Sequence, residues 1–111
     1  MLTLASEVEV LARFGRALAD PIRCRLLLAL REAPAHPSDL AETLGISRTR
    51  LSNHLACLRW CGFVTTRREH RTIHYRLADD RVSAVVELGR ALLHDNAEHI
   101  AACQRVDGAG C

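Results

Sequence analysis

The chain contains no lysine, and aromatic residues make up only 4% of it. The scarcity of aromatic residues argues against a protein built mainly of β-sheet, whereas the abundant leucine and alanine favour helices packed through aliphatic side chains. All 15 basic residues are therefore arginines, and the planar guanidinium group suits phosphates and guanine edges. The composition predicts a mainly α fold.

A long apolar run is also absent. No segment approaches the roughly 20 apolar residues that cross a bilayer, and the first ten residues, MLTLASEVEV, are acidic where a secretion signal is basic. We therefore expect a cytoplasmic protein with no membrane partner. In that reducing compartment, five cysteines favour metal binding or redox sensing over a disulfide framework.

The hydrophobic pattern predicts the order of helices and strands. Apolar residues recur at intervals of three and four along five segments, which is typical of amphipathic helices. Asp20, Ser38 and Ser47 are expected to cap the second, third and fourth helices, and Gly45 separates the last two. Two short segments rich in β-branched residues follow and predict a hairpin. The expected helices span 8–19, 21–32, 39–44, 48–60 and 81–103, and the expected strands span 63–66 and 72–77.

This α-α-α-α-β-β-α order predicts a winged helix-turn-helix formed as a single domain by residues 1–111. The terminal segments 1–19 and 81–103 carry apolar faces, and we expect them to form the interface of a homodimer. Packing within the protein's own core is the alternative for these faces. Residues 104–111 are expected to be a flexible tail.

The positive charge is concentrated in one part of the chain. Residues 48–76 contain seven arginines and a single acid, Glu69, although the net charge of the whole chain is only +2. A confined basic segment of this kind is typical of a nucleic-acid-binding face, with an ordinary solvated surface or a protein-binding wing as alternatives. The predicted contacts to double-stranded DNA are Ser47, Arg48, Thr49, Arg50, Ser52, Asn53 and His54 in the recognition helix and Arg67, Arg68, His70 and Arg71 in the wing.

Two cysteines are spaced so that both can bind one ion. Cys57 and Cys61 lie four residues apart in the predicted recognition helix and therefore share a face. Cys103 is the expected third ligand, with Cys111 as its substitute. Cys24, inside the second helix and close to its apolar stripe, is more typical of a buried structural thiol than of a ligand.

The chemistry of the ligands favours a soft ion. A site made of thiolates prefers Cd(II), Pb(II), Hg(II) or As(III) over Ni(II) or Co(II). His54, His94 or His99 as a ligand would shift the preference toward Zn(II). The alternatives are two small residues packed under the wing, a redox-active thiol pair and, remotely, a thiol enzyme. The enzyme is disfavoured because no base and orienting acid stand beside the cysteines.

The segments ALADPIRCRLLLAL and DLAETLGISRTRLSNHLACLRWCGFV resemble the ArsR/SmtB family of metal-responsive repressors. The resemblance covers nearly the whole chain and implies a metal-free dimer that occupies an imperfectly palindromic operator and leaves it when metal binds. The spacing of Cys57 and Cys61 further resembles a cadmium- and lead-sensing branch of the family, in which the third cysteine comes from the C-terminal region of the partner subunit. Cys103 occupies approximately that position, and Cd(II) or Pb(II) is therefore the expected inducer.

Two other metal-site patterns of the family are missing. The segment HPSDLAE lacks the cysteine pair that many arsenic and cadmium sensors carry in the first helix of the helix-turn-helix. Arg81 and Val82 stand two residues after Asp79 and Asp80, so the Asp-x-His pattern that begins another common site is absent as well. The resemblance therefore disfavours a zinc, nickel or cobalt sensor of that second kind.

Overall fold

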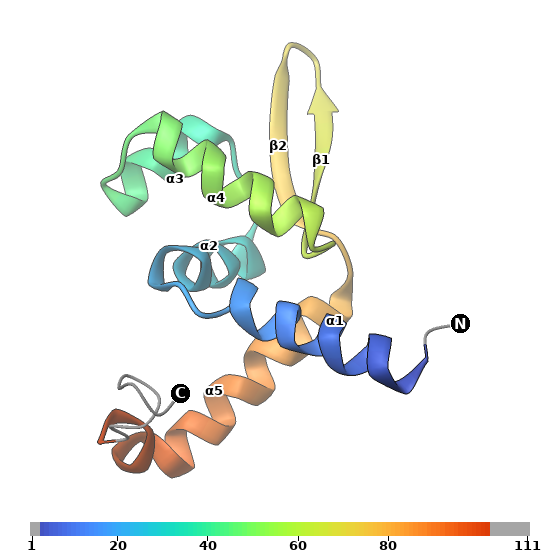
Figure 1. Ribbon diagram of the computed structural model, residues 1–111. Coiled ribbons are helices and arrows are strands. Elements are labelled where there is room, and N and C mark those ends of the chain that lie inside the picture. Colours follow the sequence, from blue (N-terminus) through green and yellow to red (C-terminus); the bar gives the residue numbers. More distant parts are fainter. Residues whose placement is uncertain (1–2, 103–111) are drawn as a thin grey trace.

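The structure is a computed structural model that describes residues 3–102. Within this range it contains five helices and one antiparallel hairpin (Figure 1). The predicted order of elements is confirmed. The elements are α1 (Leu4–Ala17), α2 (Pro21–Glu32), α3 (Pro37–Leu44), α4 (Arg48–Trp60), β1 (Val64–Glu69), β2 (Thr72–Leu77) and α5 (Asp80–Ala101).

Capping residues set the limits of α2 and α4 where the sequence predicted them. The Asp20 carboxylate accepts hydrogen bonds from the amides of Ile22 (2.8 Å) and Arg23 (3.0 Å) at the start of α2. Ser47 Oγ accepts from the Arg50 amide at 3.1 Å and begins α4. Gly45 ends α3 with a φ of 69°, a left-handed conformation that glycine adopts without steric cost.

Several predicted boundaries are wrong, among them the end of α1, which is Ala17 rather than residue 19. Helix α1 begins at Leu4 rather than at residue 8, because Thr3 caps it by accepting from the Ser6 amide. Helix α3 is capped by His36 rather than by Ser38, whose amide donates to the imidazole of His36 at 3.1 Å. Strand β1 spans Val64–Glu69, because pairing with β2 continues to Glu69 opposite Thr72.

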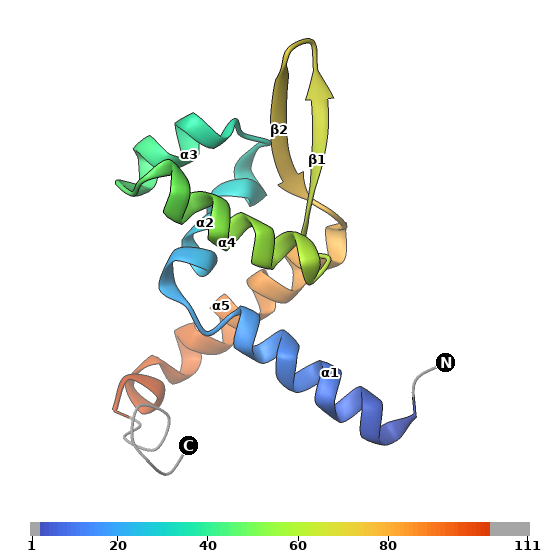
Figure 2. The ribbon, with the colours of Figure 1, turned by 45° about the horizontal axis from the view of Figure 1, so that its top comes forward.

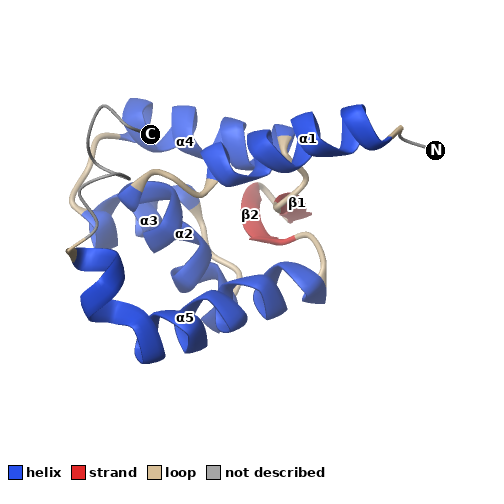
Figure 3. Ribbon diagram, turned by 60° about the horizontal axis from the view of Figure 1, so that its bottom comes forward, coloured by secondary structure: helices blue, strands red, loops and turns tan. Residues whose placement is uncertain are grey.

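Leucines from the three central helices form the core. Helix α2 contacts α3, α4, β2 and α5, and Figure 3 shows it between α4 and α5. The predicted apolar stripes of α2 and α4 are confirmed as core, because their leucines are almost completely buried. The buried leucines are Leu26, Leu27 and Leu30 of α2, Leu40 and Leu44 of α3, and Leu51, Leu55 and Leu58 of α4.

The hairpin is anchored at its base and projects from the end of α4 (Figures 1 and 2). Tyr75 of β2 exchanges two backbone hydrogen bonds with Ala35, at 2.9 and 2.8 Å, which ties the hairpin to the segment before α3. His70 forms the turn with a φ of 57°, and the Thr72 hydroxyl donates to the Glu69 carbonyl at 2.9 Å. The tip is thus exposed, with its base fixed to the domain.

Helices α1 and α5 leave large apolar side chains in solvent. Leu11 is 68% exposed and Leu88 is 71% exposed, whereas Val82 and Val86 of α5 pack partly against the core. Helix α5 bends at Asn96, whose φ of −127° is not helical. Across residues 3–102, none of the helices has the length and apolar character to cross a membrane. The predicted extension of the last helix to 103 and the tail 104–111 lie outside the described residues.

Candidate functional site

The outward face of α4 presents short polar side chains. Leu51, Leu55 and Leu58 are buried, so residues about half a turn away on this helix point to solvent. Thr49 and Asn53 lie there, and both are exposed. Hydroxyl and amide groups pair with base edges in the major groove, so this face has the chemistry that a recognition helix requires.

The predicted DNA-contacting residues fall into two exposed groups, one at the start of α4 and one around the tip of the hairpin. The two groups lie on α4 and on the hairpin, which the short segment 61–63 connects. No acid other than Glu69 lies within the hairpin strands, and the wing therefore attracts phosphates. The exposed members are Ser47, Arg48, Thr49, Arg50, Ser52, Asn53, Arg67, Arg68, His70 and Arg71.

His54 is placed differently from the rest of this set. Its side chain is only 16% exposed, and its Nδ1 lies 3.7 Å from the Asp20 carboxylate at the start of α2. The prediction grouped His54 with its neighbours in sequence, whereas the turn of the helix directs it toward α2 instead of outward. We therefore leave His54 out of the DNA-contacting face.

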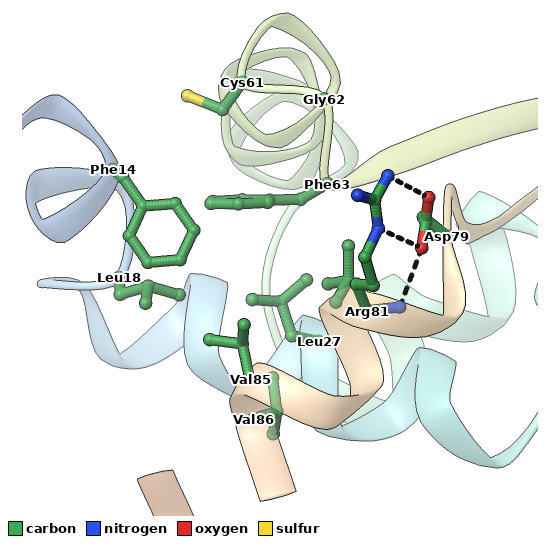
Figure 4. Close-up of a pocket in the computed structure, with 11 residues that line it drawn as sticks. Phe14, Leu18, Leu27, Cys61, Gly62, Phe63, Asp79, Arg81, Val85 and Val86 are labelled. Atoms are coloured by element: carbon green, nitrogen blue, oxygen red, sulfur yellow. Dashed lines mark hydrogen bonds and ion pairs between the residues drawn. The ribbon is translucent and has the colours of Figure 1, made fainter. Parts of the chain in front are cut away.

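The thiols of Cys57 and Cys61 lie together at the C-terminal end of α4. Cys57 is half-buried, and Cys61 is the exposed residue that ends the helix, with its amide donating to the Cys57 carbonyl at 3.0 Å. Figure 4 shows the Cys61 thiol pointing away from Gly62 and Phe63, to the side on which α1 lies. The spacing in sequence thus produces two neighbouring sulfur atoms on one side of the helix.

The pKa of Cys61 is raised above the ordinary cysteine value. Its first cause is the protein around the sulfur, which excludes water, and the neighbouring Cys57 thiol adds to it. The nearby guanidinium of Arg23 acts in the opposite direction. Cys61 therefore favours the protonated form, and a metal ion must displace that proton to bind.

Arg23 connects these thiols to the corner between α1 and α2. Its Nε donates to the Ala17 carbonyl at 2.7 Å, and its Nη2 donates to the Arg16 carbonyl at 3.0 Å. These bonds satisfy carbonyls at the end of α1, which lack partners within their own helix. From sequence, Asp20 is predicted only as the cap of α2 and Arg23 is not predicted at all, because their further contacts arise where the corner between α1 and α2 meets α4.

Near Cys61, an aromatic contact joins α1 to the segment that follows α4. Phe14 and Phe63 meet edge to face, with ring centroids 5.0 Å apart. They line a pocket of about 320 Å³ between α1, the end of α4 and α5, and Cys61 lies at its edge (Figure 4). The contact places α1 directly against the segment that follows α4.

The other cysteine and the histidines considered as alternative ligands do not join the thiol pair in the described residues. Cys24 is half-buried, its thiol donates to the Leu18 carbonyl at 3.1 Å, and burial raises its pKa. His94 and His99 are exposed on α5. Between residues 3 and 102, no group of three or more cysteine, histidine or acidic side chains is arranged to hold a metal ion. Cys103 and Cys111 lie outside that range.

A helix-turn-helix followed by a basic hairpin defines a winged helix-turn-helix DNA-binding domain. Residues 20–66 match the family described as "Bacterial regulatory protein, arsR family". Together with the relatives described next, this match shows that the chain belongs to the arsR family of bacterial regulators. The predicted fold and family are confirmed.

Two curated relatives cover most of the chain. The transcriptional regulator CmtR of Mycobacterium tuberculosis is 48% identical over 94 residues, which are 84% of this chain and 80% of the relative. The probable mercury resistance operon repressor of Streptomyces lividans is 41% identical over 102 residues, which are 92% of this chain and 82% of the relative.

Two solved structures show the same fold. The cadmium sensor CmtR from M. tuberculosis, solved by NMR, has a TM-score of 0.60 and 51% identity, over 67% of this chain and 76% of that chain. The homodimeric winged helix-turn-helix domain of Mb0332 from Mycobacterium bovis has a TM-score of 0.80 and 28% identity, over 89% of this chain and 95% of that chain.

Proposed function

We propose that the protein is a metal-responsive transcriptional repressor whose metal-free homodimer binds operator DNA and is released by a soft metal ion. The observation that carries this proposal is the position of Cys57 and Cys61. They lie at the end of the same helix that carries the outward DNA-reading face, about one and two turns beyond Asn53, and close to the corner between α1 and α2. Effector chemistry and DNA contacts thus share one rigid element.

The exposed apolar faces of α1 and α5 support the homodimer. Exposed apolar surface of this extent is typical of protein interfaces, and the relative Mb0332 is a homodimer with the same domain architecture. In this proposal, Leu11 and Leu88 belong to the interface. A two-fold dimer presents two recognition helices to two half-sites, which fits an imperfectly palindromic operator.

The donor atoms support a thiol-loving ion. Cys57 and Cys61 supply two sulfur ligands, and because no third ligand completes the set within residues 3–102, we assign Cys103 as the third. A soft metal ion binds thiolate ligands in preference to oxygen ligands, and when bound it would bring positive charge to this end of α4. Cd(II) or Pb(II) is the proposed inducer, because the relative CmtR is a cadmium sensor. The mercury repressor of S. lividans makes Hg(II) the second candidate.

The coupling between the two functions runs through α4 and its neighbours. Ligation of both thiols removes their protons and fixes the end of α4 beside Arg23, which holds the end of α1. A change in the position of α1 alters the dimer and therefore the spacing of the two recognition helices. Such couplings typically amount to about 1–3 kcal/mol, and DNA weakens metal binding by the same factor.

The test is a titration that records binding and release together. The reduced protein, bound to a labelled duplex that it has selected from a random-sequence pool, is titrated with Cd(II), Pb(II), Hg(II), As(III) and Zn(II). Thiolate-to-metal absorption reports metal binding, and fluorescence anisotropy reports DNA release. We expect Cys57→Ser, Cys61→Ser and Cys103→Ser each to impair release without weakening metal-free DNA binding.

Cys24→Ser is the matched control, because its thiol bonds to the Leu18 carbonyl instead of facing the thiol pair. It should respond to metal as the unaltered protein does. A Cys57→Ser variant that still releases DNA normally with every metal excludes the assigned site. Release caused by an oxidant in the absence of metal favours a redox repressor instead.

A further inference from the structure

A groove of about 490 Å³ lies between the C-terminal half of α4 and strand β2. It is lined by Ser52, Ala56, Arg59, Trp60 and Tyr75. Trp60 is 91% exposed, more than any other large apolar residue whose exposure the structure describes. An indole held almost entirely in water marks a surface that gains from being covered.

Helix geometry places Trp60 on the outward face of α4. It follows Asn53 by seven residues and Thr49 by eleven, and at 3.6 residues per turn all three point within about 20° of one direction. The face that carries the predicted base contacts therefore continues along the helix to Trp60. Its last turn is aromatic where its first turns are polar.

The groove has the chemistry of an anion-binding surface. Arg59 contributes a guanidinium, and Ser52, Tyr75 and Trp60 contribute a hydroxyl, a phenol and an indole N–H, all of which donate hydrogen bonds. None of the five lining residues is acidic. Donors beside a flat aromatic surface suit a sugar-phosphate chain, since the phosphate accepts and the sugar packs against the ring.

The position of the groove relates it to the path of a duplex. Its two walls are the recognition helix and the wing, and Figures 1 and 2 show the hairpin rising from the end of α4. In a complex with DNA, one sugar-phosphate backbone of the duplex separates the DNA groove that α4 enters from the DNA groove beneath the wing. That backbone must cross the space between α4 and the wing. We propose that this α4–wing groove binds that sugar-phosphate segment, with Arg59 on a phosphate and Trp60 against a deoxyribose.

This proposal rests on the DNA binding in the proposed function and is independent of the metal. The test measures the affinity of the reduced, metal-free protein for its selected duplex between about 50 and 200 mM salt. Arg59→Gln should lower the salt slope by about one and the affinity roughly fivefold near 0.15 M salt. Trp60→Ala should weaken binding with the slope unchanged, and Trp60→Phe should restore part of the loss.

Arg81→Gln is the matched control for charge. Arg81 is exposed, bonds only to Asp79 and lies outside the groove, so this variant should keep the slope of the unaltered protein. Equal slopes for Arg59→Gln and Arg81→Gln would overturn the proposal. Because Trp60 lies on the surface, its replacement should leave the far-ultraviolet circular dichroism unchanged.

The single tryptophan of the chain provides a second readout. Saturating duplex should move the Trp60 emission to shorter wavelength and protect it from acrylamide. Unchanged quenching in the complex contradicts the proposal. So does a tryptophan that is already protected from acrylamide in the free protein, to a degree that rises with protein concentration, because a second copy of the chain then occupies the groove. Loss of metal response alone affects neither measurement, so failure of the sensing proposal is distinguishable.

Discussion

Cys61 combines three local influences at the end of α4. The surrounding protein and the Cys57 thiol raise its pKa, while the Arg23 guanidinium opposes them. The thiol is therefore mostly protonated at neutral pH, and binding of an ion requires that the proton leave. If Cys61 is a ligand as proposed, protons and metal ions compete for its sulfur.

This competition predicts how metal affinity depends on pH. Affinity should rise with pH by about tenfold per unit for each thiol that loses its proton, and the rise should continue until the pH passes the raised pKa of Cys61. In Cys61→Ser the slope of log affinity against pH should fall by about one. Competition titrations with a chelator at several pH values measure it. An unchanged slope in Cys61→Ser excludes this thiol as a ligand.

Asp20 gives a second prediction for a single residue. The Arg23 amide is the main cause that holds the pKa of Asp20 below its ordinary value, so its contribution to stability is complete above the pKa in the unfolded chain and is lost as pH falls through the lower folded pKa. Asp20→Ala should cost about 1 kcal/mol of unfolding free energy at pH 7. Urea unfolding should show the difference shrinking in acid.

Asp20→Asn is the control for charge. The amide oxygen still accepts from the helix N-terminus, so most of the stability at pH 7 should remain while the dependence on acid disappears. If Asp20→Ala and Asp20→Asn are equally destabilised at pH 7, the cap is not what Asp20 contributes.

Among the elements, two glycines have opposite requirements. Gly45 needs a φ of 69° to end α3, whereas Gly15 lies inside α1, and a Cβ at either position meets no atom within 4 Å. Gly45→Ala should cost about 1 kcal/mol of unfolding free energy through backbone strain alone. Gly15→Ala should add about 0.5–1 kcal/mol, because alanine favours the helix. Thermal or urea unfolding measures both, and the same sign for the two variants would contradict this account.

Local patterns predicted the elements well where the signal lies within the element itself. The recurrence of leucine at intervals of four and three residues, together with the Ser47 cap, predicted α4 at its observed bounds. The start of α3 was missed because an imidazole, His36, acts as the cap in place of the expected serine. The end of β1 was missed because a strand ends where its partner stops pairing, which depends on two segments at once.

The same distinction applies to the candidate site. The spacing of Cys57 and Cys61 on one helix predicted that their thiols are neighbours, and the structure places them so. The contributions of Arg23 and Asp20 could not be predicted, because they arise where the corner between α1 and α2 meets α4. For His54, the type of residue suggested DNA, whereas its direction on the helix leads to Asp20.

For the whole molecule, the exposed apolar faces predict an obligate interface. Leu88→Glu places a carboxylate in the proposed dimer contact, where an unpaired buried charge costs more than the roughly 1.4 kcal/mol that equals a tenfold change in affinity. The dissociation constant of the dimer should rise at least tenfold, and DNA affinity should fall with it. Sedimentation equilibrium measures the first effect and anisotropy the second.

Thr43→Glu adds the same charge to an exposed position on α3 and should leave the dimer intact. A Leu88→Glu protein that sediments like the unaltered one shows that α5 lies outside the interface. The apolar surface of α5 then requires another explanation.

Helix α4 has only 13 residues and three differently occupied faces: the leucines in the core, the polar stripe that ends at Trp60, and the thiol pair. In the proposed function, the face that reads the promoter and two thiols that bind the effector ion are therefore encoded by one short stretch of sequence. If the proposed function holds, exchange of α4 together with Cys61 between two regulators of this architecture moves the DNA-reading face and two of the three thiol ligands at once, while the third ligand stays with the C-terminal segment. Redirecting the protein to a new promoter without changing what it responds to requires substitutions confined to the outward stripe.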